Sequence, residues 1–247
     1  MKLNIFKTQE ELIAEMAAYF IKSANAAIEE KGAFDVSLVG GNSPKKLYEL
    51  LATKEFKNQT DWHKINFFFG DERYVPANDP QSNALMVQNV LFTPLKISEK
   101  QIFKIIEAQS IASLPTPDAA AKKYNETIVT HFKNKPVRFD LMLLGLGDNS
   151  HTASLFPFTP VLFESSATVK AVFLKDQNIY RITMTAPMIN QSKQIAFLVY
   201  GKEKAEAVYH ILKDVQDIEK YPAQLIHPTE GELEWFLDTD AASLLEN

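Results

Sequence analysis

The fold is decided by a stretch that passes from apolar residues through glycines into titratable side chains, Phe139-Asp140-Leu141-Met142-Leu143-Leu144-Gly145-Leu146-Gly147-Asp148-Asn149-Ser150-His151-Thr152-Ala153-Ser154-Leu155-Phe156-Pro157. Its apolar block, residues 141–144, is typical of a strand buried in a parallel sheet. Gly145 and Gly147 then permit a tight turn. Ligands of open α/β sheets bind beyond the carboxyl ends of the strands, so His151 is a candidate general base. The residue types equally allow a plain turn and helix cap over residues 148–150, with His151 at the surface.

A second apolar block ends in another glycine turn. Residues 34–39 are predicted to form a strand, which is followed by Gly40, Gly41, Asn42, Ser43 and Pro44. Ser43 suits the N-cap of the next helix, and Pro44 suits its first position, where a missing N–H is tolerated. Backbone N–H groups at such a helix start would face a ligand and bind an anion. The alternative is an ordinary connection between a strand and a helix, as most short glycine motifs are.

Charged residues follow a third apolar block. Residues 65–69 are expected to form a buried strand, and Gly70-Asp71-Glu72-Arg73 comes directly after it. Ser82 and Asn83 then open an apolar helix. A charge cluster of this kind most often forms a solvated loop with local ion pairs. Charged groups thus again come directly after an apolar strand, as they do after residues 141–144.

The rest of the chain alternates helices with strands. Helices are expected from Thr8 to a stop at Gly32 and from Thr116 through Phe132. Strands are expected at residues 169–174, 181–185 and 195–200, and Gly201 opens an amphipathic helix with Lys204 in its first turn. The alternation predicts an α/β fold of three layers, with a mainly parallel, Rossmann-like sheet and helices on both faces. We expect a single domain over residues 1–247.

Composition excludes several classes of function. Hydrophobic residues make up 46% of the 247 residues, which is ample for a packed core. The formal net charge of -5 gives no general electrostatic reason to bind nucleic acid or an anionic membrane, so we expect neither as a partner. The absence of cysteine excludes disulfides and thiolate chemistry. The amino terminus lacks the apolar core of a signal peptide, and no apolar run approaches the roughly 20 residues of a membrane span, so we expect a cytoplasmic protein.

The opening stretch resembles the signature of the 6-phosphogluconolactonases, usually Gly-x-Gly-x-Asp-Gly-His-Thr-Ala-Ser-Leu-Phe-Pro, and more distantly that of the glucosamine-6-phosphate deaminases. Gly145, Gly147 and residues 151–157 match, whereas the family's Asp-Gly is Asn149-Ser150 here. Further matches are the glycine loop at residues 40–44, Gly-Asp-Glu-Arg at 70–73, Arg-x-Thr-x-Thr at 181–185 and Gly-x-x-Lys-Ala at 201–205. The tail at residues 233–245 is similar to the family's closing strand and helix.

The resemblance implies the fold shared by sugar-phosphate lactonases, deaminases and ribose-5-phosphate isomerases. It also implies hydrolysis of 6-phospho-D-glucono-1,5-lactone to 6-phospho-D-gluconate, with no metal or organic cofactor, by a monomer or small homo-oligomer. His151 is then the base, oriented by Asn149 or Asp148. Arg73 would position the lactone or stabilise its oxyanion, and Asp71 would hold Arg73 or a sugar hydroxyl. The residues expected to bind the sugar phosphate are Gly40, Gly41, Asn42, Ser43, Arg181 and Lys204.

Other functions remain open from the sequence. Without the resemblance, Arg181 is better explained as a strand-edge residue paired with a carboxylate, and Lys204 as a solvated side chain. An amino-sugar-phosphate deaminase or isomerase is disfavoured because residues 152–157 lack the Glu of that branch. A sugar-phosphate sensor of the same fold is conceivable because Asn149 replaces an acid, although no basic patch is present. A purely structural protein would have little use for His151 and two arginines at strand ends.

Overall fold

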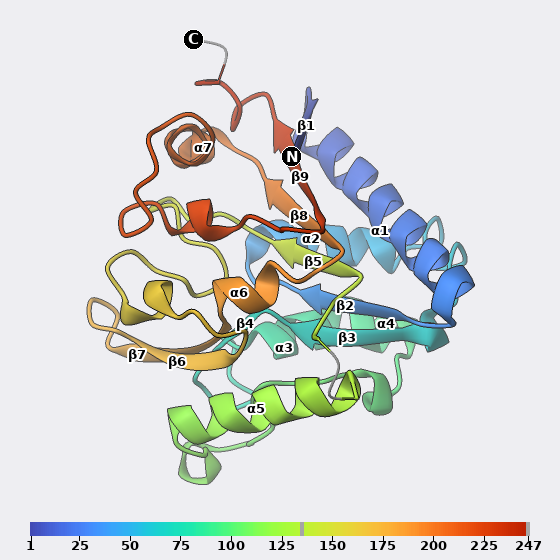
Figure 1. The fold of residues 1–247 in the computed structure, drawn as a ribbon. Coiled ribbons are helices and arrows are strands. Elements are labelled where there is room, and N and C mark those ends of the chain that lie inside the picture. The colour runs from blue at the N-terminus through green and yellow to red at the C-terminus, as the bar shows by residue number, and fades with distance from the viewer. Residues whose placement is uncertain (134–135, 246–247) are drawn as a thin grey trace.

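A computed structural model describes residues 1–133 and 136–245 and shows an α/β architecture with two sheets (Figure 1). Its strands are β1 (Lys2–Phe6), β2 (Phe34–Leu38), β3 (Ile65–Phe69), β4 (Asp71–Arg73), β5 (Leu141–Leu144), β6 (Val169–Leu174), β7 (Ile179–Met184), β8 (Gln194–Val199) and β9 (Glu232–Asp238). Its α-helices are α1 (Gln9–Lys31), α2 (Asn42–Leu51), α3 (Asn83–Val87), α4 (Thr93–Leu95), α5 (Pro117–His131), α6 (Ala186–Ile189) and α7 (Ala205–Leu212).

The main sheet is parallel throughout its six strands, in the order β1-β9-β8-β5-β2-β3. Every residue of β2 and β5 is buried, as are five of the six residues of β8. Strands covered on both faces need apolar side chains in both directions, which explains the continuous apolar blocks in the sequence. The prediction of a mainly parallel α/β sheet is confirmed. The carboxyl ends of β2, β3, β5 and β8 all lie at one edge of this sheet.

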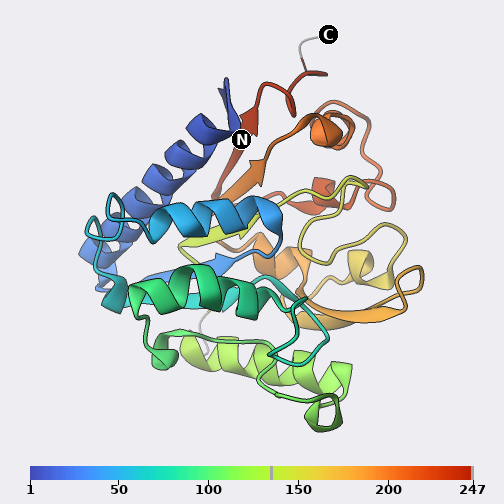
Figure 2. The same ribbon diagram turned by 180° about the vertical axis from the view of Figure 1, so that it is seen from behind.

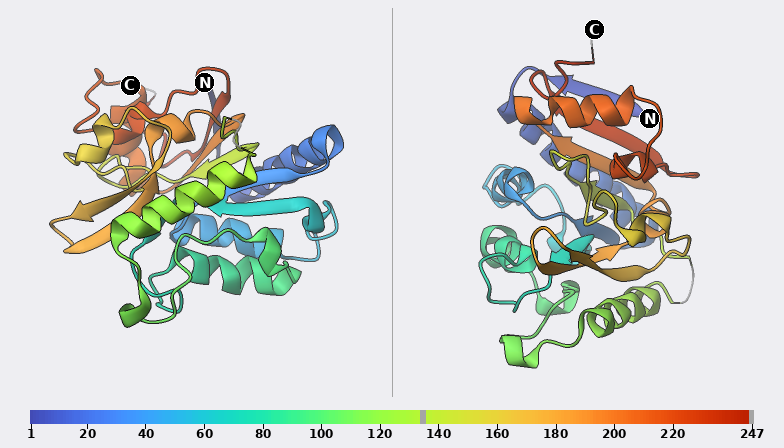
Figure 3. Two further views of the ribbon diagram at one scale, coloured as in Figure 1. Left: turned by 60° about the horizontal axis from the view of Figure 1, so that its bottom comes forward. Right: turned by 90° about the vertical axis from the view of Figure 1, so that its left-hand side faces the viewer.

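Helices cover both faces of the main sheet, as predicted. The longest, α1, begins after Thr8, whose side chain accepts the N–H of Glu11, and ends at Gly32 in the left-handed conformation with φ 83°. Figure 2 shows α1, α2 and α3 in front of one face. Figure 1 shows α5, α6 and the small sheet on the opposite face, and the side view in Figure 3 shows the main sheet between the two layers. None of the helices in the described ranges is long and apolar enough to cross a membrane.

A second, antiparallel sheet of order β4-β7-β6 is not predicted by the sequence. Gly70 joins it to the main sheet, because its N–H donates to the carbonyl of Leu38 (3.0 Å) and its carbonyl accepts the N–H of Met184 (2.9 Å). The prediction of a loop at residues 71–73 is therefore wrong, and these residues form β4. A strand of three charged residues carries no apolar alternation. Only its pairing with β7 decides its conformation.

Both ends of the chain differ from expectation. Strand β1 pairs with β9 at the edge of the main sheet and was not predicted, since its mixed residues lack the apolar run of the central strands. In β9, Trp235 is buried and stacks on Phe197 with ring centroids 3.9 Å apart, which confirms its assignment to the core. After β9, residues 239–244 form turns instead of the closing helix. The Asp238 carboxylate accepts the N–H of Ala241 (2.8 Å) and reverses the chain there.

Candidate active site

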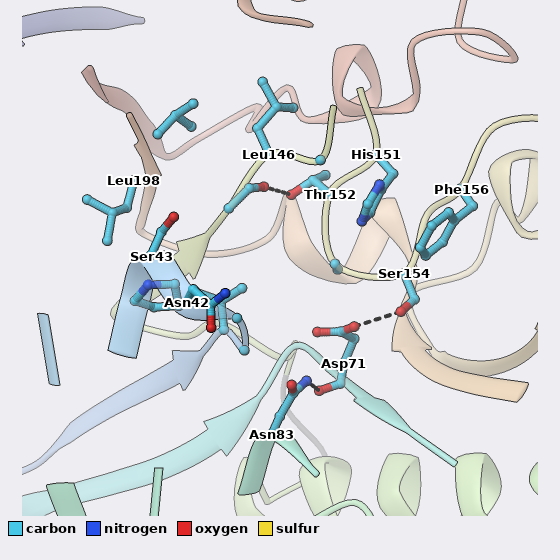
Figure 4. A pocket seen from close by; sticks show the side chains of 18 of the residues that line it. Asn42, Ser43, Asp71, Asn83, Leu146, His151, Thr152, Ser154, Phe156 and Leu198 are labelled. Carbon is cyan, nitrogen blue, oxygen red and sulfur yellow. Dashed lines mark hydrogen bonds between the residues drawn. The ribbon is translucent and has the colours of Figure 1, made fainter. Parts of the chain in front are cut away.

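A cleft of about 430 Å³ opens at the carboxyl edge of the main sheet (Figure 4). Its walls come from the turns after β2, β5 and β8, together with β4 and β7 of the small sheet. Most of the predicted site residues line it, namely Gly40, Gly41, Asn42, Ser43, Asp71, Arg73, His151, Arg181 and Lys204. Asp148 and Asn149 lie behind its wall and line a neighbouring groove. Positions far apart in the sequence are thus brought together in one cleft.

His151 is held from two sides. The Oδ1 atom of Asn149 lies 2.5 Å from Nδ1 of the ring, and the Phe156 ring stacks on the imidazole with centroids 3.9 Å apart and planes 16° apart. Since Oδ1 can only accept, Nδ1 carries the proton and Nε2 keeps its lone pair. A Cβ at Gly147 would lie 2.0 Å from the imidazole Nδ1, so only glycine leaves room for this ring position. The loop therefore presents His151 with an unprotonated Nε2.

The surroundings of His151 favour the neutral ring. Burial and, after it, the positive charges of Lys204 and Arg181 together lower the pKa of its imidazole to about 4, against a smaller opposite effect of Asp148. Its partner Asn149 carries no charge that would stabilise an imidazolium. At pH 7 the ring is therefore uncharged and can accept a proton.

The turn before His151 is strained at one residue. Ser150 has φ 63°, a left-handed conformation that costs most L-residues about 1–2 kcal/mol. The lactonase signature places glycine at this position, and glycine adopts positive φ without that cost. The second departure from the signature, Ser150, thus has a structural consequence of its own.

Replacing Ser150 with Gly is expected to raise the free energy of unfolding by about 0.5–1 kcal/mol, because the relief of strain exceeds the added flexibility of the unfolded chain. Thermal denaturation should show a melting temperature higher by roughly 1–4 °C. Ser150→Ala is the matched control, since it also removes the hydroxyl but keeps the Cβ and the strain. An equal gain in both variants would assign the effect to the hydroxyl and contradict the strain argument.

The glycine turn after β2 starts its helix earlier than predicted. Gly41, with φ 108°, is the N-cap of α2, and Asn42 is its first residue. The assignment of Ser43 as N-cap and Pro44 as first position is wrong by two residues. Pro44 is tolerated at the third position because the first four N–H groups of a helix have no intrahelical partner. At Gly40 a Cβ would lie 1.8 Å from Oδ1 of Asn83, so this glycine lets α3 approach the loop.

Two arginines occupy directly opposite positions on neighbouring strands of the small sheet. Arg73 of β4 is paired in register with Arg181 of β7. Arg73 donates to the carbonyl of Gln81 (2.8 Å) and Arg181 to Oε1 of Gln177 (3.0 Å), and neither contact supplies a negative charge. Burial, and then the charge of Arg73, lower the pKa of Arg181 from its usual value. Directly opposed like charges destabilise a sheet, so an anion bound between the arginines would stabilise it.

The buried carboxylates beside these arginines have other partners. Asp71 accepts a hydrogen bond from the hydroxyl of Ser154 (2.6 Å, Figure 4). Within the described part of the chain, Asp71 forms no ion pair with Arg73, which lies two residues further along β4. Glu72 accepts the backbone N–H groups of Arg73, Asn83 and Ala84 at 2.8–2.9 Å. Glu72 thus braces the start of α3. The hydrogen bond from Ser154 leaves the other carboxylate oxygen of Asp71 for a ligand.

Lys204 and Asp148 form an ion pair at the rim of the cleft. Lys204 precedes α7 and is 19% exposed, whereas Asp148 is 72% exposed. Of the two residues proposed to orient His151, only Asn149 contacts its ring, and the carboxylate of Asp148 is directed to Lys204 instead.

Several residues of the cleft were given no role by the sequence. Ser154 and Phe156 lie within the opening stretch, but their contacts with Asp71 and His151 are not encoded in any spacing. Other polar residues of the lining without an assigned role are Asn83, Thr152, Gln177 and Glu203. No group of three or more His, Asp or Glu side chains that could hold a metal ion occurs within residues 1–133 and 136–245.

Comparisons with known proteins find similarity over nearly the whole chain. Residues 7–235 match the family model of glucosamine-6-phosphate isomerases/6-phosphogluconolactonase. A 6-phosphogluconolactonase of Synechocystis sp. is 39% identical over 247 residues, covering 99% of this chain and 98% of that protein. The structure of 6-phosphogluconolactonase from Trypanosoma brucei is similar with a TM-score of 0.85 and 26% identity, over 99% and 98% of the two chains. A monomeric glucosamine-6-phosphate deaminase is similar with a TM-score of 0.80 and 25% identity, over 99% of this chain and 100% of the other.

Proposed function

Since the chain belongs to the family of glucosamine-6-phosphate isomerases and 6-phosphogluconolactonases, we infer that its cleft hydrolyses 6-phospho-D-glucono-1,5-lactone to 6-phospho-D-gluconate. The protein is an enzyme, a hydrolase that acts in the pentose phosphate pathway. One observation supports the mechanism above the others. His151 is a neutral imidazole whose Nδ1 is occupied by Asn149, so that Nε2 can accept a proton beside a set of cationic side chains.

The reaction requires one base that later acts as an acid. Nε2 of His151 takes a proton from water while the water oxygen attacks the lactone carbonyl carbon and forms a tetrahedral oxyanion. The carbonyl re-forms, the bond from this carbon to the ring oxygen breaks, and the imidazolium returns its proton to the departing oxygen. The product is the open-chain acid, which ionises at pH 7. A low pKa makes His151 a weak base but makes its imidazolium a strong acid for the second step.

The cationic side chains divide into two proposed roles. Arg181, Lys204 and the backbone at residues 40–43 bind the phosphate, for which a guanidinium fork and a helix N-terminus are suited. Arg73 lies opposite Arg181 and stabilises the oxyanion or positions the lactone. Asp71 accepts a sugar hydroxyl with the carboxylate oxygen that Ser154 does not use. The alternative in which Asp71 fixes Arg73 is not supported by any contact between their side chains.

The rival functions are less well supported. The deaminase branch is represented by a similar structure at 25% identity, but residues 152–157 lack the Glu that the resemblance associates with that branch. The hypothesis of a sugar-phosphate sensor without catalytic activity rests on the replacement of the signature's acid by Asn149. Asn149 nevertheless contacts the ring of His151 and fixes its tautomer, which a sensor without catalysis would not need.

A coupled assay with freshly generated 6-phosphogluconolactone tests the proposed function. We expect the purified protein to accelerate lactone opening above the spontaneous rate, and to do so in the presence of EDTA. Binding of 6-phosphogluconate without any acceleration would identify the protein as a sensor. Full loss of activity in EDTA that zinc restores would contradict a mechanism based on these side chains alone.

Replacing Asn149 with Asp is expected to keep the enzyme active and to move the acidic limb of its pH profile upward. The carboxylate can still accept from Nδ1, and its negative charge stabilises the imidazolium and raises the pKa of His151 from about 4. His151 is then lost as a base at a higher pH than in the wild type. The measurement is kcat/KM as a function of pH between about 4 and 9, since this parameter reports groups of the free enzyme.

Asn58→Asp is the matched control for this charge, because Asn58 is exposed and does not line the cleft. Its profile should follow that of the wild type. A downward shift of the acidic limb in Asn149→Asp, or no shift at all, would show that residue 149 does not control the charge of His151. An inactive wild type with a strongly active Asn149→Asp variant would support the sensor.

The proposed cellular setting follows from the substrate. A soluble sugar phosphate and a chain without cysteine favour a cytoplasmic enzyme. The expected partner is the small-molecule substrate itself, and the charge of -5 supports neither a nucleic acid nor a membrane.

A further inference from the structure

We propose that Asp148 occupies Lys204 in the free enzyme as a stand-in for the substrate phosphate, so that phosphate and the Asp148 carboxylate compete for one ammonium group. This inference rests on the proposed function and assigns to Asp148 a role in substrate affinity and product release. It replaces the expectation that Asp148 orients His151.

The geometry of the pair is asymmetric. Lys204 lines the cleft, whereas Asp148 lines the neighbouring groove of about 850 Å³, and the two hollows share the side chains of Phe156 and Gln177. The ion pair spans the wall between them. Lys204 is mostly buried at 19% exposure, and Asp148 is 72% exposed. The lysine is therefore placed for a ligand in the cleft, while the carboxylate can return to water when it is displaced.

Asp148 is not needed to hold the ring of His151 in place. The ring of His151 is already held by Asn149 and Phe156. In the lactonase signature, the position of Asp148 is the variable residue before the Asp-Gly, so the carboxylate here stands one position away from the family's acid. No other ion pair of Lys204 occurs within residues 1–133 and 136–245.

The relative strengths of the two interactions favour displacement of Asp148 from Lys204 by phosphate. An ion pair with so exposed a carboxylate is worth a factor of about 1.4 to 5 in an equilibrium constant. A phosphate dianion in the cleft also meets Arg181 and the start of α2, so its bond to Lys204 is one of several charge-assisted contacts. The substrate phosphate therefore displaces Asp148. After hydrolysis the carboxylate competes again and weakens the hold on the product, which carries the same phosphate.

Titration with inorganic phosphate, followed by isothermal calorimetry, tests the competition without any turnover. Asp148→Asn should bind phosphate about two- to fivefold more tightly than the wild type, because the competitor is gone. Lys204→Met should bind phosphate more weakly, and adding Asp148→Asn to it should change the affinity little. Asp176→Asn is the matched control, since it removes another exposed carboxylate that lines the same groove.

Kinetics provide the second measurement. In Asp148→Asn, the ratio of kcat/KM for the phosphorylated lactone to kcat/KM for unphosphorylated gluconolactone should rise by the same two- to fivefold factor. The ratio cancels any effect of Asp148 on His151, which both substrates share. Inhibition by 6-phosphogluconate should strengthen in parallel.

Three results would overturn the proposal. They are weaker phosphate binding by Asp148→Asn, a gain that persists undiminished in the Lys204→Met background, and an equal gain in Asp176→Asn. The first result would mean that Asp148 positions Lys204 for phosphate. The other two would mean that the gain in phosphate affinity comes from the overall charge near the groove and not from competition for Lys204. A wild type that binds phosphate as described but opens no lactone would instead contradict the proposed function alone.

Discussion

Replacing His151 with Asn is expected to lower kcat by at least about a hundredfold, the contribution of a positioned general base. Asn keeps a polar side chain of similar reach but has no lone pair of comparable basicity to replace Nε2. The neighbouring groups that remain, Arg73 and Arg181, can still bind substrate, so KM should change far less than kcat. Steady-state kinetics with the phosphorylated lactone, after subtraction of spontaneous opening, would measure both parameters.

The control for this variant is His63→Asn, because His63 is exposed in the 3₁₀ turn before β3 and does not line the cleft. It should behave as the wild type. Thermal denaturation of His151→Asn separates a chemical loss from unfolding, since the imidazole contributes a stacking contact with Phe156. Activity that survives the loss of His151 in a folded protein would remove it as the base and reopen the mechanism.

Replacing Arg181 with Ala is expected to raise KM for the phosphorylated lactone by about 30- to 150-fold. This corresponds to losing a charge-assisted bidentate contact of roughly 2–3 kcal/mol. The effect on unphosphorylated gluconolactone should be small, because that substrate has no group for the guanidinium to bind. Removing Arg181 also relieves its repulsion with Arg73 in the free enzyme, so the protein should remain folded. The measurement is KM and kcat for both lactones.

Arg138→Ala is a matched control with the same change of charge. Arg138 pairs with Glu230 away from the cleft, so its loss should leave both substrates unaffected. Equal damage to the two lactones in Arg181→Ala would show that Arg181 acts on the reacting carbonyl. The roles proposed for Arg73 and Arg181 would then have to be exchanged.

The low pKa of His151 has a consequence for the working range of the enzyme. A base that stays unprotonated down to about pH 4 permits activity in mildly acidic solution, where an imidazole of ordinary pKa would be charged. Asn149 holds the ring without adding a negative charge that would raise this pKa.

The sequence by itself determined the central strands and the location of the cleft. Strands β2, β3, β5 and β8 are buried on both faces and must be apolar, and each is followed by glycine or a charged residue where the chain leaves the core. These signals are local, because burial acts on each residue of a strand separately. For the same reason His151, Arg73 and the glycine loop could be assigned to one edge of the sheet before any distance was known.

Only the tertiary structure decided which side chains meet. β4 has no apolar pattern, and its pairing with β7 alone places Arg73 opposite Arg181. Asp148 and Lys204 are 56 residues apart, and their ion pair depends on the packing of α7 beside the turn after β5. The choice between Asn149 and Asp148 as partner of His151 likewise depended on the conformation of the turn after β5, in which Asn149 contacts the ring and Asp148 contacts Lys204. Contacts between distant segments leave no periodic trace in a sequence, because they arise when separate elements pack together.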